Sequence, residues 1–271
     1  MTRADTALRA SAAIRRTAWR AGVRQQGERE LPEETAVALV HDATTTAVMM
    51  ATPADLEDLG VGFSLTEGIV SDPAEISGVE VVEGQLGVEV RLWLAGPPAA
   101  ALAERRRKLV GPTGCGLCGV DSLAEAARPP PPVRDGLTVT PAAIHGAMAA
   151  LAGAQRLGAA TRAVHAAGWW TENAGLVAIR EDVGRHNALD KLAGALARAE
   201  RAHGDGVLAL TSRVSVEMVQ KAACIGAQVL VAVSAPTTLA VRTAEQAGIT
   251  LVAVARDDGF EVFTGGHRIV A

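Results

Sequence analysis

Three short apolar runs in the C-terminal half constrain the fold more than any other feature of the sequence. They are GVLALTS (206–212), QVLVAVS (228–234) and ITLVAVA (249–255), and none alternates between apolar and polar residues as a half-exposed strand does. The segments between them, VEMVQKAACIG and PTTLAVRTAEQAG, are helical in character. Continuous apolar strands separated by helices are typical of buried parallel strands with crossover helices. We therefore predict an α/β fold for this half of the chain.

Polar residues follow each of these predicted strands. They are residues 211–213 (Thr-Ser-Arg), residues 234–236 (Ser-Ala-Pro) and Arg256. The carboxyl ends of parallel strands meet at one edge of a sheet, where α/β proteins bind ligands and where helix N-termini favour anions. These loops therefore predict a site for a phosphate-bearing ligand, although Ser and Thr at such positions also commonly cap helices.

The first half of the chain shows a different pattern. Ala36–Val40 and Thr46–Met50 are predicted to be paired strands, a helix opens at Pro53, and VEVVEGQLGVEVRLWL alternates by twos around Glu83–Gln85, which indicates a hairpin. Four consecutive prolines, Pro129–Pro132, then form a spacer that neither a helix nor a central strand accommodates.

We therefore predict a flexible N-terminal arm (1–30), a smaller α+β domain (31–128), a proline spacer (129–133) and an α/β domain (134–271). The arm is rich in Arg and Ala, and we predict no regular structure in it. In the last domain we also predict a helix from Pro141 towards Gly158, a strand at Leu176–Ile179 and a helix at Asn187–Arg201.

The composition excludes several classes of function. The 271 residues carry a formal net charge of -4, so nothing draws the whole chain to nucleic acid, and any anion site has to be local. No run reaches the roughly 18 apolar residues of a membrane span, and the N-terminus lacks the apolar core of a signal peptide. The three cysteines are too few for a disulfide scaffold. We expect a cytoplasmic protein with reduced thiols and with neither nucleic acid nor membrane as a partner.

Two of the cysteines, Cys115 and Cys118, stand in GCGLCG (114–119). A structural zinc site needs a second CxxC or a histidine pair, and a zinc deaminase needs H-x-E; the sequence has neither, so we predict no metal. A thioredoxin-like exchanger would place the pair at a helix start within a βαβ unit, and here those units come later. The glycines of 111–119 predict an accessible loop instead, and the basic run at 104–108 favours the thiolate. Cys224, within AACIGA, is typical of a buried, inert cysteine.

Longer motifs indicate a family. They are LTEGIV (65–70), GCGLCG (114–119), VHAAGW (164–169), REDVGRHNALDKL (180–192), SRVSVEMVQKAACIG (212–226), SAPTTLAVRTAEQAGITLVAVAR (234–256) and VFTGGHRI (262–269). Through these motifs, which span nearly everything after the arm, the chain resembles the formate dehydrogenase accessory sulfurtransferases, also called sulfur carrier proteins.

The resemblance implies an enzyme that accepts persulfide sulfur from a cysteine desulfurase on Cys115, assisted by Cys118. The sulfur would go to the molybdenum bis(molybdopterin guanine dinucleotide) cofactor destined for formate dehydrogenase. The resemblance also implies a homodimer and a fold similar to that of cytidine deaminases without the zinc site. A chaperone that binds the same cofactor without covalent chemistry is the alternative.

The cofactor site of the family corresponds here to Val254, Ala255, Arg256, Asp257, Asp258 and Gly259, and Arg213, Ser234 and His186 are further candidate contacts. Other conspicuous residues have two interpretations each. His165 and His186 either reach the ligand or are structural, and Asp182 either orients His186 or favours a helix N-terminus. The pair Trp169–Trp170 forms a stacking surface for a guanine, or it makes packing or dimer contacts. We interpret Glu67 as an ordinary residue at the end of a helix.

Overall fold

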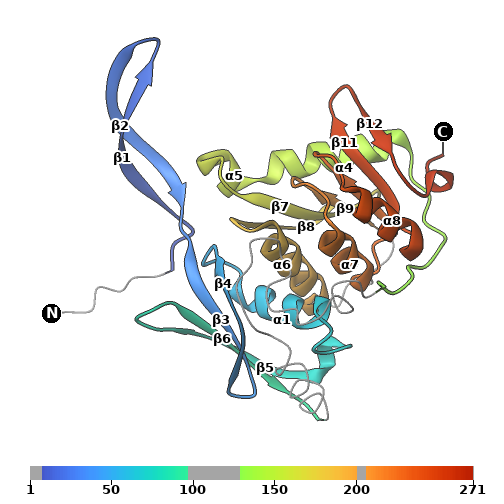
Figure 1. Cartoon of the computed structure of the whole chain (residues 1–271), viewed down its shortest axis with the longest axis horizontal. Coiled ribbons are helices and arrows are strands. Elements are labelled where there is room, and N and C mark those ends of the chain that lie inside the picture. Colours follow the sequence, from blue (N-terminus) through green and yellow to red (C-terminus); the bar gives the residue numbers. More distant parts are fainter. Residues whose placement is uncertain (1–7, 97–128, 200–205, 271) are drawn as a thin grey trace.

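The computed structural model describes residues 8–96, 129–199 and 206–270. Within these residues the strands form a hairpin (β1-β2), a four-stranded sheet of order β4-β3-β6-β5 and a six-stranded sheet of order β12-β11-β10-β9-β7-β8. Figure 1 shows the six-stranded sheet with its helices above the four-stranded sheet, and the hairpin projecting from one side.

The elements have the following bounds. The hairpin consists of β1 (Ser11–Arg20) and β2 (Val23–Pro32). The smaller sheet contains β3 (Thr35–His41), β4 (Thr44–Ala51), β5 (Ile76–Glu83) and β6 (Val88–Leu94), with helix α1 (Leu56–Thr66) packed on it. The larger sheet contains β7 (His165–Thr171), β8 (Gly175–Asp182), β9 (Val207–Leu210), β10 (Val229–Ala232), β11 (Thr250–Arg256) and β12 (Gly259–Val262). Its helices are α4 (Pro141–Ala154), α5 (Arg156–Thr161), α6 (Arg185–Arg198), α7 (Val216–Cys224) and α8 (Thr238–Ala247).

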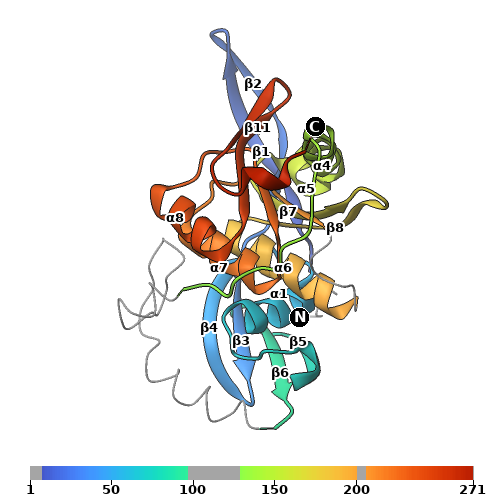
Figure 2. The same cartoon turned by 90° about the vertical axis from the view of Figure 1, so that its right-hand side faces the viewer.

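The central strands of the larger sheet are buried on both faces. β9, β10 and β11 run parallel, and α7 and α8 connect them. Successive side chains point to opposite faces, so Leu208 and Leu210 pack with α6, α7 and α8, whereas Val207 packs with α4. Figure 2 shows these two groups of helices on opposite sides of the sheet. Burial on both faces explains the continuous apolar runs, and the predicted α/β fold is confirmed.

Helix α1 lies between the smaller sheet and α6. Its Leu56 and Leu59 join the core of the smaller sheet. On its other side, Gly62 approaches α6 so closely that a Cβ there would lie 1.7 Å from the carbonyl oxygen of Asp190. Likewise, a Cβ added to Gly194 of α6 would lie 2.0 Å from the carbonyl oxygen of Asp58. The two glycines therefore allow the two helix backbones to touch. The larger sheet on one side and α1 on the other bury α6 from residue 187 to residue 197.

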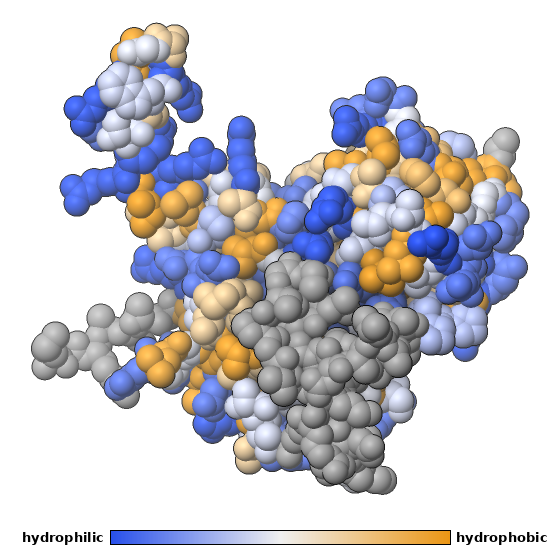
Figure 3. All heavy atoms as spheres, in the orientation of Figure 1, coloured by the Kyte–Doolittle hydropathy of each residue, from blue (hydrophilic) through white to orange (hydrophobic). Residues whose placement is uncertain are grey.

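The N-terminal arm differs from its prediction. From Ser11 to Pro32 it is an antiparallel hairpin that turns at Ala21 and Gly22, both at positive φ. Its strands carry almost no apolar alternation, which is why no strand was predicted, and cross-strand pairs such as Ser11–Glu30 (2.6 Å) join them instead. Figure 3 shows hydrophilic and hydrophobic side chains mixed along the hairpin, and Trp19 near its tip is 69% exposed.

Other elements match their predictions with shifted ends. The helix expected from Pro53 begins at Leu56, and the helix expected to reach Gly158 is broken at Gln155 into α4 and α5. α6 begins two residues earlier than predicted and ends at Arg198. The strands β7 and β12 were not predicted, because β7 is rich in Ala and Gly, which have low strand propensity, and β12 has only four residues. The predicted domain boundaries stay predictions.

Candidate functional site

Four strands of the larger sheet end at one edge. β7 is antiparallel to both β8 and β9, so β8 and β9 run in the same direction, which β10 and β11 share. The last residues of these strands, Asp182, Leu210, Ala232 and Arg256, therefore lie along one edge, and the segments entering α6, α7 and α8 start there. This is the edge at which the sequence predicts ligand binding.

The loops after β9 and β10 touch each other. Val214 forms a bridge with Pro236, and the Thr237 N–H donates to the Val214 carbonyl at 3.0 Å. Two predicted site residues belong to these loops: Arg213 is exposed and Ser234 is half-buried. The structure thus brings these two residues to neighbouring loops of the same edge.

The predicted cofactor segment, Val254–Gly259, forms the hairpin turn between β11 and β12. Arg256 pairs with Gly259, and residues 257 and 258 occupy the exposed turn. Val254 has a φ of 51°, in the left-handed region that a branched residue rarely adopts, where the ladder changes register. β11 is four strand spacings, roughly 19 Å, from β8.

Four residues with unpartnered buried atoms stand at the starts of α6 and α7, and we call them the helix-entry cluster: Arg185, His186, Ser215 and Glu217. Each has a buried polar atom with no hydrogen-bond partner among the residues that the structure describes, namely Nε of Arg185, Nε2 of His186, Oγ of Ser215 and Oε2 of Glu217. Ser215 is the N-cap residue of α7, yet its side chain makes no capping bond, and Gly184 at the start of α6 has no side chain to offer. Buried polar atoms are normally paired, so this cluster is the candidate binding site.

The cluster carries a histidine that stays neutral at physiological pH. Burial, followed by Arg185 and Lys221, lowers the pKa of His186 to about 3, although Glu67 acts in the opposite direction. Burial and Arg185 also lower the pKa of His165 at the start of β7. Both imidazoles therefore act as hydrogen-bonding groups rather than as cations.

A buried ion-pair network lies beneath the cluster. The Lys221 ammonium on α7 donates to Asp190 (2.9 and 3.1 Å), Glu67 (2.7 Å) and the Thr66 hydroxyl (3.0 Å). Burial acts to lower the pKa of Lys221, but Asp190 and Glu67 outweigh it and hold this pKa above its ordinary value. Glu67 is thus more than the ordinary helix-end residue that the sequence predicts, because it ties α1 to α7.

A second network settles the role of Asp182. Its carboxylate accepts hydrogen bonds from the Lys191 ammonium (2.6 Å), the Thr52 N–H (3.0 Å), the Gly184 N–H (2.7 Å) and the Asn187 amide (3.0 Å). Asp182 therefore anchors the start of α6 to the segment between β4 and α1, and no hydrogen bond to His186 is among its contacts in the described residues. Of the two interpretations of Asp182, the structure supports a role at the N-terminus of α6 and not the orientation of His186.

The cysteines and tryptophans have different outcomes. Cys115 and Cys118 lie outside the described residues, so their roles stay predictions. The prediction that Cys224 is buried is wrong: it is exposed at the end of α7, with its thiol 3.6 Å from the Thr66 carbonyl. Trp169 is buried in the core with α6, and Trp170 packs beside α4, so the packing interpretation holds for this pair.

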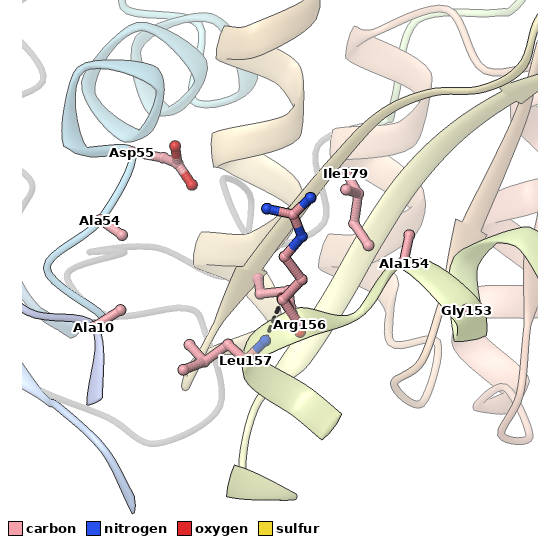
Figure 4. A pocket seen from close by; sticks show the side chains of 9 residues that line it. Ala10, Ala54, Asp55, Gly153, Ala154, Arg156, Leu157 and Ile179 are labelled. Atoms are coloured by element: carbon pink, nitrogen blue, oxygen red, sulfur yellow. Dashed lines mark hydrogen bonds between the residues drawn. The ribbon is translucent and has the colours of Figure 1, made fainter. Parts of the chain in front are cut away.

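A separate hollow lies between the base of the arm and α5. Figure 4 shows the Arg156 side chain extending into it near Asp55 and Ile179. The Glu181 carboxylate accepts from the N–H groups of Leu157 and Gly158 at its wall. None of the predicted site residues lines this hollow.

The described residues contain no group of three His, Cys, Asp or Glu side chains placed to hold a metal ion, and no described helix has the length and apolarity to cross a membrane.

Sequence reasoning missed most of this site. Glu217, Lys221 and Asp190 were not singled out, because charged residues on a helix are usually solvated. The available signal was the pair Glu217 and Lys221, four residues apart within the otherwise apolar VEMVQKAACIG.

Comparisons with known proteins agree with the family resemblance that the sequence motifs indicate. The model of the FdhD/NarQ family matches residues 32–270. The sulfur carrier protein FdhD of Agrobacterium fabrum is 52% identical to this chain over 262 residues, and the alignment covers 95% of each of the two chains. The sulfur carrier protein FdhD of Brucella abortus is 48% identical over 247 residues, and that alignment covers 91% of this chain and 92% of the relative. A crystal structure from Desulfotalea psychrophila, described as a formate dehydrogenase accessory protein, superimposes with a TM-score of 0.75 at 26% identity, over 97% of this chain and 100% of the other. The chain therefore belongs to the FdhD/NarQ family.

Proposed function

We propose that this protein is a sulfurtransferase of molybdenum-cofactor maturation. It accepts persulfide sulfur from a cysteine desulfurase on Cys115 and transfers it to the molybdenum bis(molybdopterin guanine dinucleotide) cofactor required by formate dehydrogenase. The observation that carries the proposal is the similarity over nearly the whole chain to relatives named sulfur carrier proteins, together with the GCGLCG motif in this sequence.

The sulfur chemistry balances with two cysteines. The Cys115 thiolate attacks the outer sulfur of the donor persulfide, the S–S bond breaks, and the donor cysteine leaves as a thiolate. Attack of Cys118 on the inner sulfur of the Cys115 persulfide then forms a disulfide and releases the terminal sulfur as hydrosulfide to the acceptor. A cellular thiol reduces the disulfide afterwards. The basic residues at 105–108 favour the thiolate form that both attacks need.

The sheet edge supports binding of an extended anionic cofactor, which is the substrate of the transfer. The N-termini of α7 and α8 favour negative charge, and Arg213 and Arg256 offer guanidinium groups for pyrophosphate. The strands that precede these two parts of the site, β8 before His186 and β11 before the turn at 254–259, are four strand spacings apart, roughly 19 Å. We propose that the cofactor lies along this edge, with Ser234 between the two ends.

The proposal includes a cytoplasmic location and a homodimer, with the desulfurase as donor and formate dehydrogenase as recipient. The alternative function is that of a chaperone that binds the cofactor without covalent chemistry. The unpartnered atoms of the helix-entry cluster fit both functions, and only the sulfur chemistry of Cys115 separates them.

Intact-mass measurement after incubation with a cysteine desulfurase and free cysteine tests the proposal. The wild type should gain about 32 Da per sulfur atom, and a reducing thiol should reverse the gain. Cys115→Ser should abolish the gain, whereas Cys224→Ser should keep it, because Cys224 is an exposed cysteine outside the GCGLCG motif and serves as the matched control. Loading that persists in Cys115→Ser would contradict Cys115 as the carrier. No mass gain in the wild type, with a control acceptor protein loading normally, would favour the chaperone.

A further inference from the structure

The helix-entry cluster lies one turn above the buried ion pair of α6 and α7. Glu217 precedes Lys221 by four residues, and His186 precedes Asp190 by four, so each pair shares one face of its helix. Lys221 and Asp190 bond to each other at 2.9 Å, and both helices begin at the same sheet edge. Glu217 and His186 therefore lie on the facing sides of the two helices, one turn closer to the edge.

Glu217 is the member of the cluster whose environment points most directly to a ligand. The residue is only 7% exposed, and its Oε2 receives no hydrogen bond from the described part of the chain. A buried carboxylate oxygen without a donor is costly, so its position favours a ligand that brings N–H or O–H groups. Close to it in sequence, Ser215 supplies a buried hydroxyl, and Arg185 on α6 supplies a buried N–H donor.

We infer that the helix-entry cluster binds the 2-amino-4-oxopyrimidine edge that guanine and pterin share, with Glu217 as the residue that determines specificity. That edge presents a ring N–H and an exocyclic amine side by side, next to a carbonyl oxygen. A carboxylate accepts from both donors, and the donors of Arg185 and Ser215 suit the carbonyl.

Other rings do not match this arrangement. Adenine carries a ring acceptor where guanine carries N–H, so it would place a lone pair against the carboxylate. The inference rests on the proposed function, because the molybdenum cofactor contains both a guanine and a pterin. It goes further by assigning one buried carboxylate of this chain to ring recognition.

Calorimetric titration of the full chain with nucleotides and a pterin tests the inference. The wild type should bind GDP more tightly than ADP, and IDP, which lacks the 2-amino group, should bind roughly 5- to 10-fold more weakly than GDP. Glu217→Gln should weaken GDP roughly 10- to 100-fold and favour XDP over GDP, because the new amide N–H donates to the 2-oxo group of xanthine. Glu245→Gln, which removes an exposed carboxylate on α8, should bind as the wild type does.

The same titration with 6-hydroxymethylpterin and with its 2-oxo counterpart distinguishes the two sources of the edge. If Glu217→Gln weakens the binding of the pterin and not that of GDP, the Glu217 carboxylate recognises the pterin ring. The inference then holds for the pterin part of the cofactor.

Three results would overturn the inference. The first is that the wild type does not distinguish GDP from IDP and also does not distinguish the pterin from its 2-oxo counterpart. The second is that Glu217→Gln binds GDP and the pterin as tightly as the wild type does, and the third is that the wild type binds neither GDP nor the pterin. The comparison of GDP with IDP, like that of the pterin with its counterpart, uses the wild type alone, so it decides even where the variant does not fold. Sulfur loading of Cys115, measured by mass, tests the proposed function independently of these ligands.

Discussion

Replacing Lys221 by Met should strongly destabilise the protein. Lys221 is 7% exposed and Asp190 is 3% exposed, and the three N–H donors of the ammonium lie within hydrogen-bonding distance of four oxygens, two of Asp190 and one each of Glu67 and Thr66. Met fills a similar volume but leaves Asp190 with the Thr66 hydroxyl (2.6 Å) and a second carboxylate, Glu67, close by. Removing one partner of a buried pair costs about 3–5 kcal/mol, since the remaining charge stays buried without compensation.

Urea unfolding at pH 7, followed by far-UV circular dichroism, measures this loss. With a slope of about 3 kcal/mol per molar urea, a loss of 3–5 kcal/mol lowers the midpoint by about 1–1.7 M. Adding Asp190→Asn to Lys221→Met should recover part of the loss, because the uncompensated charge is then gone.

Arg91→Met is the matched control. Arg91 pairs with Glu89 at 2.7 Å, but both side chains are more than two-fifths exposed, so removing this pair should cost less than about 1 kcal/mol. A loss below about 1 kcal/mol for Lys221→Met as well, or a double variant no more stable than Lys221→Met, would refute the reasoning.

Two further predictions concern α1 and α6. Gly62→Ala should destabilise the protein by more than about 1 kcal/mol, although alanine has the better helix propensity, because the new Cβ meets the Asp190 carbonyl. The control is Gly153→Ala on α4, where a new Cβ has no atom within 4 Å and should not destabilise the protein. Equal urea midpoints for the two variants would contradict this prediction. His186 has a pKa of about 3 when folded, against about 6.5 unfolded, so the unfolded chain binds the extra proton between these values and the free energy of unfolding falls as pH is lowered, by up to about 1.4 kcal/mol per unit. His186→Asn should flatten this slope between pH 7 and pH 5 in urea titrations, and an unchanged slope would count against a neutral, buried imidazole.

The sheet of the C-terminal half could be predicted because its strands are buried on both faces. Leu208 and Val207 face opposite helical layers, so neighbouring positions are all apolar and the pattern is unambiguous. The paired strands β3 and β4, and the hairpin of β5 and β6, were also predictable from local signals. The β1-β2 hairpin was not, because its polar and basic strands do not bury a face.

Most of the candidate site could not be predicted, because it depends on which helix covers which. Lys191 and Lys221 are ordinary helix residues in sequence, and they are buried since α1 packs across α6 and reaches α7. Cys224 shows the opposite error: its neighbours Ala223 and Ile225 are buried, but it points outward at the end of α7. Burial of single side chains is a tertiary property, and local composition does not determine it.

A sulfur-label chase tests the role of Cys115 as the carrier most directly. The protein is loaded with ³⁵S from a cysteine desulfurase, freed of donor, and incubated with formate dehydrogenase whose cofactor lacks the sulfur ligand. We predict that the label moves to the cofactor in step with the gain of dehydrogenase activity, and that Cys115→Ser supports neither. Activity that returns with Cys115→Ser, or with no label on the cofactor, would contradict sulfur transfer through Cys115.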